Sequence, residues 1–138
     1  MKTMKMGCQI YVKGSVEAVD FYCRAFNLTI GMNFKGSDGT YVHAALTTKG
    51  PWWRKPADRL AVAEDGRGAQ AVTPDGQWPV MSFDCWDLGT REAVDRAYRV
   101  LSEGALSNDN PDGPGPVPWN EYCFSVVDKF GVYWWVAI

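Results

Sequence analysis

Apolar residues follow two different spacings along the chain, and these spacings alternate in a fixed order. Residues 6–12 and 81–86 alternate between apolar and polar side chains, as a half-buried strand does. Residues 16–26 and 93–101 instead carry apolar side chains at the three-and-four spacing of a helix with one buried face. Three strand-like stretches follow each helix: LTIGMNF, TYVHAALTT and RLAVAE in the first half, and a weak stretch at 105–117, EYCFSVV and VYWWVAI in the second. Each half therefore predicts the order β-α-β-β-β.

The two halves also repeat one another in sequence. The stretch IYVKGSVEAVD (10–20) resembles CWDLGTREAVD (85–95), with Glu17 and Glu92 standing 75 residues apart. Ser15 and Thr90 fall where a hydroxyl caps a helix. The repeat predicts two modules, 1–65 and 80–138, joined by a Gly-rich linker at 66–79 within a single domain, 1–138. Residues 107–118 are rich in proline, which suits a sheet edge or a loop, and we expect them to be mobile.

Alternation assigns strand residues to one of two faces. In the first strand Met6, Cys8, Ile10 and Val12 are predicted to face the helix, and Gln9 and Tyr11 to face away from it. The repeat places Phe83 and Cys85 toward the second helix, with Ser82, Asp84 and Trp86 opposite. On the same argument Val132, Trp134, Val136 and Ile138 face the helix, whereas Tyr133, Trp135 and Ala137 do not. In the third strand His43 groups with Tyr41 and Ala45, opposite Val42, Ala44 and Leu46.

Composition narrows the classes of protein to consider. The chain has 138 residues, of which 46% are apolar and 22% charged, a balance typical of one globular domain. A net charge of -2 argues against nucleic acid as a partner, and no apolar run is long enough to span a membrane. The N-terminal stretch is basic but lacks a long apolar run and a small-residue cleavage site, so we expect no signal peptide. Four cysteines without a C-x-x-C pair argue against a zinc site of usual spacing and favour a cytoplasmic protein with reduced thiols.

Three motifs carry a resemblance to a known family. EAVDFYCRAFN (17–27), YVHAALTTKG (41–50) and DKFGVYWW (128–135) resemble segments of the vicinal oxygen chelate superfamily, which includes glyoxalase I, extradiol dioxygenases, fosfomycin-resistance enzymes and bleomycin-binding proteins. The PhnB-like branch is the most similar, although Lys129 replaces the usual proline of the last motif. The resemblance implies an α+β fold in which two βαβββ modules form a cupped, incomplete barrel. It also implies that ligands bind inside the cup and that the protein is a homodimer.

The residues predicted to face the cup form the candidate ligand-binding site. They are Gln9, Tyr11, His43, Asp84, Trp86, Tyr133 and Trp135. Each has a structural alternative: the polar residues face a wet groove, the aromatic rings fill a small core, and His43 bonds to backbone. Trp78 and Trp119 flank loops at the predicted pocket edges. Trp52 and Trp53 lie in a loop and suit a subunit interface, a lid, or packing over the sheet.

Two functions remain open at this point. The first is a metal-free protein that binds a small, aromatic molecule in the cup without a cofactor. The alternative is a lyase or dioxygenase that uses one divalent metal ion held by Gln9, Glu64 and Asp84. Trp135 argues for the first, because the resemblance places a metal-binding carboxylate at that position. A dimeric scaffold without a ligand is a third option. No residue is assigned as catalytic, and the sequence does not name the ligand.

Overall fold

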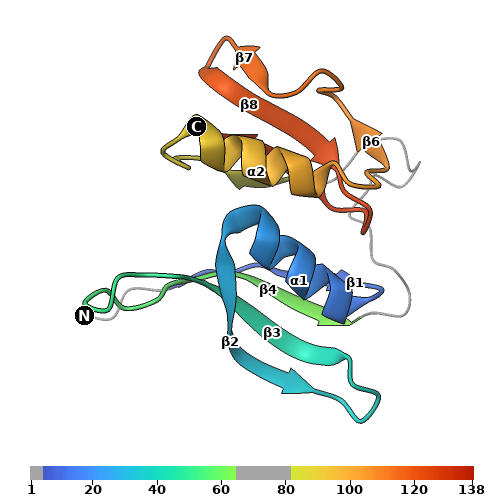
Figure 1. The fold of residues 1–138 in the computed structure, drawn as a ribbon. Helices are drawn as coiled ribbons and strands as arrows, with labels where there is room; N and C mark the ends of the chain where they lie inside the picture. The colour runs from blue at the N-terminus through green and yellow to red at the C-terminus, as the bar shows by residue number, and fades with distance from the viewer. Residues whose placement is uncertain (1–4, 65–81) are drawn as a thin grey trace. The chain divides into compact units, whose positions relative to one another are not determined.

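The computed structural model describes residues 5–64 and 82–138, which hold two helices and nine strands. These residues divide into two compact units (Figure 1). The first unit contains the elements up to residue 64 and the second those from residue 82 onward, except that Arg24–Phe26 group with the second unit. The predicted linker, 66–79, lies outside the described residues. No helix in the described ranges is both long and apolar enough to cross a membrane.

The first unit has the predicted β-α-β-β-β order. Its four strands form one sheet in the order β1-β4-β3-β2, in which β1 pairs in parallel with β4 and the other neighbours are antiparallel. Figure 1 shows α1 lying along one face of this sheet. We call the other face the open face. The elements are β1 (Gln9–Val12), α1 (Ser15–Phe26), β2 (Leu28–Lys35), β3 (Tyr41–Thr48) and β4 (Asp58–Glu64).

The second unit repeats this plan with one change. Its sheet has the order β5-β9-β8-β6, and β7 also pairs with β8. The single weak strand predicted at 105–117 is therefore wrong in detail, because two short strands stand in its place. The proline-rich stretch lies at the edge of the sheet, as predicted. The elements are β5 (Phe83–Cys85), α2 (Arg91–Leu101), β6 (Ser107–Asn108), β7 (Gly115–Val117), β8 (Asn120–Val127) and β9 (Tyr133–Ala137).

Hydrogen bonds tie the stretch between β6 and β7 to the rest of the second unit. The Tyr98 hydroxyl donates to the Asn110 carbonyl at 2.6 Å, and the Ser125 N–H donates to the Asn110 side chain at 3.0 Å. The Asn110 N–H in turn donates to Asn108 Oδ1 at 2.8 Å. Asn110 is thus one anchor of this proline-rich segment, and the Asp109 N–H, which donates to the Ser125 carbonyl at 3.1 Å, is another. The mobility expected for the segment remains a prediction.

Burial confirms the predicted alternation only inside the strands. Ile10 and Val12 are buried, but Met6 and Cys8 are exposed. The prediction that Met6 and Cys8 face the helix is wrong because β1 begins only at Gln9. From Val132 through β9 the pattern holds as far as Val136, because Val132, Trp134 and Val136 are buried and Tyr133 and Trp135 are partly exposed. It is wrong at the end of the strand, where Ala137 is buried and Ile138 is partly exposed.

A β-bulge changes the faces at the start of β3. His43 pairs with Phe34 and Tyr41 with Lys35, so Val42 is an extra residue opposite that step. Tyr41 is consequently buried, and its N–H donates to the buried Ser15 hydroxyl, while Val42 is exposed. The predicted faces of these two residues are therefore wrong, because alternation cannot anticipate a bulge.

The two helices begin differently. Gly14, at φ 90°, precedes α1 and offers no side-chain cap, whereas the Thr90 hydroxyl accepts a bond from the Ala93 N–H at 3.1 Å. The predicted cap at Ser15 is wrong by one position, because Ser15 is already helical.

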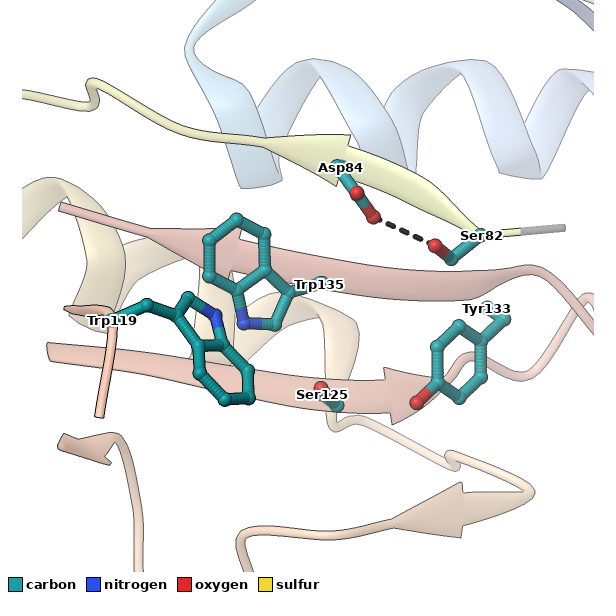
Figure 2. A pocket seen from close by; sticks show the side chains of 6 residues that line it. All are labelled: Ser82, Asp84, Trp119, Ser125, Tyr133 and Trp135. Atoms are coloured by element: carbon teal, nitrogen blue, oxygen red, sulfur yellow. Dashed lines mark hydrogen bonds between the residues drawn. The ribbon is translucent and has the colours of Figure 1, made fainter. Parts of the chain in front are cut away.

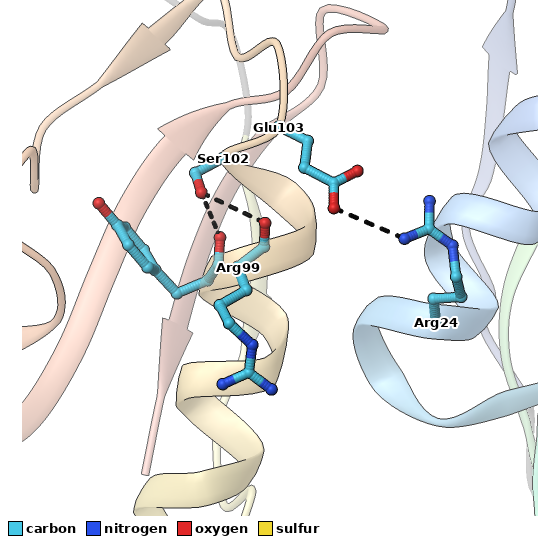
Figure 3. Close-up of polar contacts among 5 residues, drawn as sticks. Arg24, Arg99, Ser102 and Glu103 are labelled. Carbon is cyan, nitrogen blue, oxygen red and sulfur yellow. Dashed lines mark hydrogen bonds and ion pairs between the residues drawn. The ribbon is translucent and has the colours of Figure 1, made fainter.

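At the end of α2 the Ser102 hydroxyl donates to the Tyr98 carbonyl at 2.6 Å (Figure 3). Glu103 forms an ion pair with Arg24 at 3.6 Å.

A buried carboxylate organises the turn before β9. Asp128 is fully buried and accepts hydrogen bonds from the N–H groups of Phe130 and Val132 and from the Trp134 indole, at 2.9, 3.1 and 2.8 Å. Gly131 supplies the positive φ, 85°, that this turn requires. The Trp134 ring packs against Phe83 with ring centroids 5.5 Å apart. Trp134 is therefore the core member of the two adjacent indoles.

Candidate ligand-binding site

The open face of the second unit carries a row of side chains across three strands. Asp84 of β5 pairs in register with Trp135 of β9, and Trp135 pairs with Ser125 of β8. Residues paired in this way project from the same face of a sheet. Trp135 therefore lies between a carboxylate and a hydroxyl. Tyr133, two residues earlier on β9, extends the same face.

These side chains border a hollow of about 410 Å³. Figure 2 shows the indoles of Trp119 and Trp135 next to each other, with the Tyr133 hydroxyl on the far side of Ser125. The Ser82 hydroxyl donates to the Asp84 carboxylate at 2.7 Å, and this bond orients the carboxylate. A hollow of this size is within the range of small-molecule sites. Its described lining consists of Ser82, Asp84, Trp119, Ser125, Tyr133 and Trp135.

The lining combines flat apolar surfaces with a few polar atoms. Trp119 is 74% exposed and Trp135 is partly exposed, so both rings present area that a ligand would cover. Asp84 is the charged member of the lining. Aromatic faces attract other rings and also cations, and a carboxylate accepts hydrogen bonds from ligand N–H or O–H groups. The arrangement suits a planar ligand that carries a hydrogen-bond donor.

The structure brings some predicted site residues together and separates others. Asp84, Tyr133 and Trp135 meet at this hollow, and Trp119 lies at its edge as expected. Trp86 does not line it: β5 ends at Cys85, and the Trp86 side chain is 62% exposed. Trp78 lies outside the described residues. Ser125 was missed, although alternation about the buried Phe124 and Val126 would have placed it on the open face.

The remaining predicted residues form a second polar group on the open face of the first unit. Gln9 Oε1 lies 2.6 Å from His43 Nδ1, and the Gln9 amide nitrogen donates to the Tyr11 hydroxyl at 2.9 Å. The prediction that Gln9 and His43 share a face is confirmed by this contact. The Tyr11 side chain is 46% exposed and His43 is partly exposed. We call Tyr11, Gln9 and His43 the first-unit triad.

Small residues on β4 allow the triad to form. Gln9 and His43 belong to β1 and β3, which are not neighbours, because β4 lies between them. Adjacent strands are about 4.8 Å apart, so the two side chains span roughly twice that distance at the backbone. Ala61 and Ala63 pair with Gln9 and Tyr11. Their methyl groups leave the space above β4 open to the longer side chains.

The three residues considered for a metal do not supply a ready set of ligands. Glu64 accepts hydrogen bonds from the Gly14 N–H at 2.8 Å and from the Ser15 N–H and hydroxyl, both at 2.9 Å. Both of its oxygens are therefore engaged at the start of α1. Gln9 Oε1 is engaged by His43. The described residues contain no group of three or more His, Cys, Asp or Glu side chains arranged to hold a metal ion.

These hydrogen bonds lower the pKa of the Glu64 carboxyl below its ordinary value. The bond from the Ser15 N–H is the largest cause, and the bonds from the Gly14 N–H and the Ser15 hydroxyl act in the same direction. A carboxylate held in this way stabilises the positive end of a helix. The observed role of Glu64 is therefore to cap α1 from β4, a role that local sequence spacing does not reveal.

Two cysteines are poorly suited to act as nucleophiles. Burial, and to a lesser extent the Asp84 charge, raises the pKa of the Cys85 thiol to about 11. Burial likewise raises the pKa of Cys23, assisted by Asp20. A reactive cysteine requires a lowered pKa, because the thiolate is the attacking form. Neither thiol is activated in this way.

Comparison with known proteins identifies the fold. No protein-family model and no curated protein matches the chain. Among solved structures, a PhnB protein from Bacillus cereus is 21% identical, with a TM-score of 0.68 over 97% of this chain and 98% of that one. The fosfomycin resistance protein FosX from Listeria monocytogenes is 12% identical, with a TM-score of 0.62 over 99% and 94%. A glyoxalase-related enzyme from Clostridium phytofermentans is 11% identical, with a TM-score of 0.62 over 100% and 98%.

These structures share the glyoxalase/bleomycin resistance fold of the vicinal oxygen chelate superfamily, and this chain has that fold. The fold resemblance predicted from the sequence motifs is therefore confirmed. Identities of 11–21% establish the fold and leave the chemistry to be argued from the site itself.

Proposed function

We propose that this protein binds a small, planar aromatic molecule in the hollow of the second unit and does so without a metal ion. The observation that carries the proposal is the set of three aromatic side chains, Trp119, Tyr133 and Trp135, around one hollow of about 410 Å³. The ligand stacks on the indoles. Its polar group bonds to Asp84.

The geometry of the polar side chains supports this choice of ligand. Ser82 already donates to one oxygen of Asp84, which leaves the carboxylate able to accept a further bond. Trp135 lies between Asp84 and Ser125 in the strand register, so a ring stacked on it lies within reach of both. A neutral or cationic ligand with an N–H or O–H group fits this lining better than an anion does.

The alternative is a metal-dependent lyase or dioxygenase. Asp84 is a suitable hard ligand, but Glu64 caps α1 and Gln9 bonds to His43. A metal ion would have to break those contacts, and Trp135 offers it no ligand atom. The engagement of Glu64 and Gln9 therefore favours the binding protein over the enzyme.

Metal analysis and ligand titration together test the proposal. Protein purified without chelators is analysed for divalent metals, and a panel of planar aromatic compounds of different charge is titrated by calorimetry in the presence and absence of EDTA. We expect binding that EDTA does not weaken. A stoichiometric metal ion that is lost in Asp84→Ala would contradict the proposal. Failure of the entire panel to bind would favour a scaffold without a ligand.

A further inference from the structure

The first-unit triad restricts the hydrogen-bonding form of His43. In the orientation that the Gln9 amide has in the structure, its Oε1 atom can only accept a hydrogen bond, so the Nδ1 atom that lies 2.6 Å from it carries the proton. The opposite end of the same amide donates to the Tyr11 hydroxyl at 2.9 Å. The amide therefore has an assigned partner at each end. The reversed amide would donate to an unprotonated Nδ1 and accept from the Tyr11 hydroxyl, so the two orientations predict opposite forms of the imidazole.

A neutral imidazole with its proton on Nδ1 has a lone pair on Nε2. In the described part of the chain, no hydrogen bond to Nε2 is present. His43 pairs in register with Phe34 on the edge strand β2, and the Phe34 ring is 60% exposed. An exposed ring and a free acceptor thus lie on neighbouring strands of the same sheet.

We infer that Gln9 is a positioning residue that holds His43 in its Nδ1–H form, so that Nε2 is presented as an acceptor for a ligand O–H or N–H group. This role concerns the first unit and does not depend on the ligand proposed for the second. The partner of an imidazole nitrogen commonly sets which nitrogen carries the proton. Here the partner is a neutral amide, which selects the form without adding charge.

The chain contains one histidine, which makes the inference directly measurable. Long-range ¹H–¹⁵N correlation spectra distinguish a protonated from an unprotonated imidazole nitrogen without a need for assignment. At a pH where the imidazole is neutral, we expect the Nδ1–H form to exceed the Nε2–H form about fivefold or more, the factor that one net hydrogen bond supplies. A spectrum dominated by the Nε2–H form would overturn the inference.

Three variants separate positioning from a merely structural role. Gln9→Leu removes the oxygen that accepts from Nδ1–H, and the ratio of the Nδ1–H form to the Nε2–H form should revert toward that of free histidine in the same buffer. In Gln9→Glu a carboxylate acceptor remains, and the Nδ1–H form should persist. Tyr11→Phe serves as the control, because it removes the distant bond and leaves the acceptor. An unchanged ratio in Gln9→Leu would contradict the role. If Gln9→Leu does not fold, the wild-type spectrum and the Gln9→Glu spectrum decide the question.

Discussion

The two units use one plan to make two different open faces. In the first unit the residue that pairs with Gln9 is Ala61, and in the second the residue that pairs with Asp84 is Trp135. Above the alanine, long polar side chains reach across a strand and bond to one another. Beside the tryptophan, the carboxylate instead borders a hollow lined with rings. The residue at this equivalent register position, alanine in one unit and tryptophan in the other, thus decides whether the open face holds a polar group or an aromatic site.

The units also differ in how a carboxylate stabilises each of them. Glu64 and Asp128 both accept hydrogen bonds from two backbone N–H groups and from one side chain. Glu64 reaches residues about fifty positions away and is partly exposed, whereas Asp128 bonds within its own turn and is fully buried. The same chemistry should therefore be worth more in the second unit, where water cannot replace it.

The largest predicted effect is the loss of Asp128. In Asp128→Ala the N–H groups of Phe130 and Val132 and the Trp134 indole lose their buried acceptor. We expect the free energy of unfolding to fall by about 3 kcal/mol or more, as measured by urea denaturation. Asp38→Ala is the matched control, because Asp38 bonds to Thr40 in an exposed turn, and its effect should be much smaller. Equal effects would refute the contrast in burial.

Glu64→Gln should have a smaller effect that depends on pH. The variant weakens the cap of α1, and we expect a loss of about 1–2 kcal/mol at neutral pH by denaturant unfolding. The folded pKa of Glu64 is lowered below its ordinary value, so its contribution is present above the unfolded pKa and is lost as the pH falls through the folded pKa. The difference between wild type and variant should therefore shrink in acid.

Thr90→Ala provides the comparison from the second unit. It removes a local cap on α2, and we expect a loss of about 1 kcal/mol. A hydroxyl does not titrate in this range, so this loss should stay constant at the pH values where that of Glu64→Gln declines. A parallel decline in both variants would show that the pH effect does not come from the Glu64 carboxylate.

Trp135→Ala should act mainly on ligand binding. The ring is partly exposed and lines the hollow, so its removal deletes stacking area. We expect an aromatic ligand found in the panel to bind about tenfold more weakly in calorimetry, which corresponds to about 1.4 kcal/mol. An unchanged dissociation constant would place the ligand elsewhere.

The smallest effect is expected for Trp52→Ala. Trp52 is 93% exposed and lies in a loop of the first unit, where its ring contacts that of Trp53 edge-to-face with the ring centroids 5.9 Å apart. Its replacement should change the free energy of unfolding by no more than about 0.5 kcal/mol and leave ligand affinity unaltered. This variant is therefore the control for Trp135→Ala, and a loss of affinity in both would argue against the hollow as the site.

Sequence patterns predicted the elements that depend on local spacing. The three-and-four apolar spacing located both helices, strand alternation assigned Gln9 and Trp135 to the open faces, and the internal repeat matched Asp84 with Gln9. What the patterns missed depends on contacts between distant residues. The Val42 bulge follows from strand pairing, and the cap by Glu64 joins β4 to α1. Local composition predicts neither the bulge nor the cap.

The indole N–H signals of the protein provide the most direct test of the central claim. The seven tryptophans give separate ¹H–¹⁵N resonances that single Trp→Phe variants assign. Titration of an aromatic ligand from the panel in the presence of EDTA should shift the signals of Trp119 and Trp135 and leave those of Trp52 and Trp53 in place. Shifts confined to Trp52 and Trp53, or binding that EDTA abolishes, would contradict an aromatic, metal-independent site in the second unit.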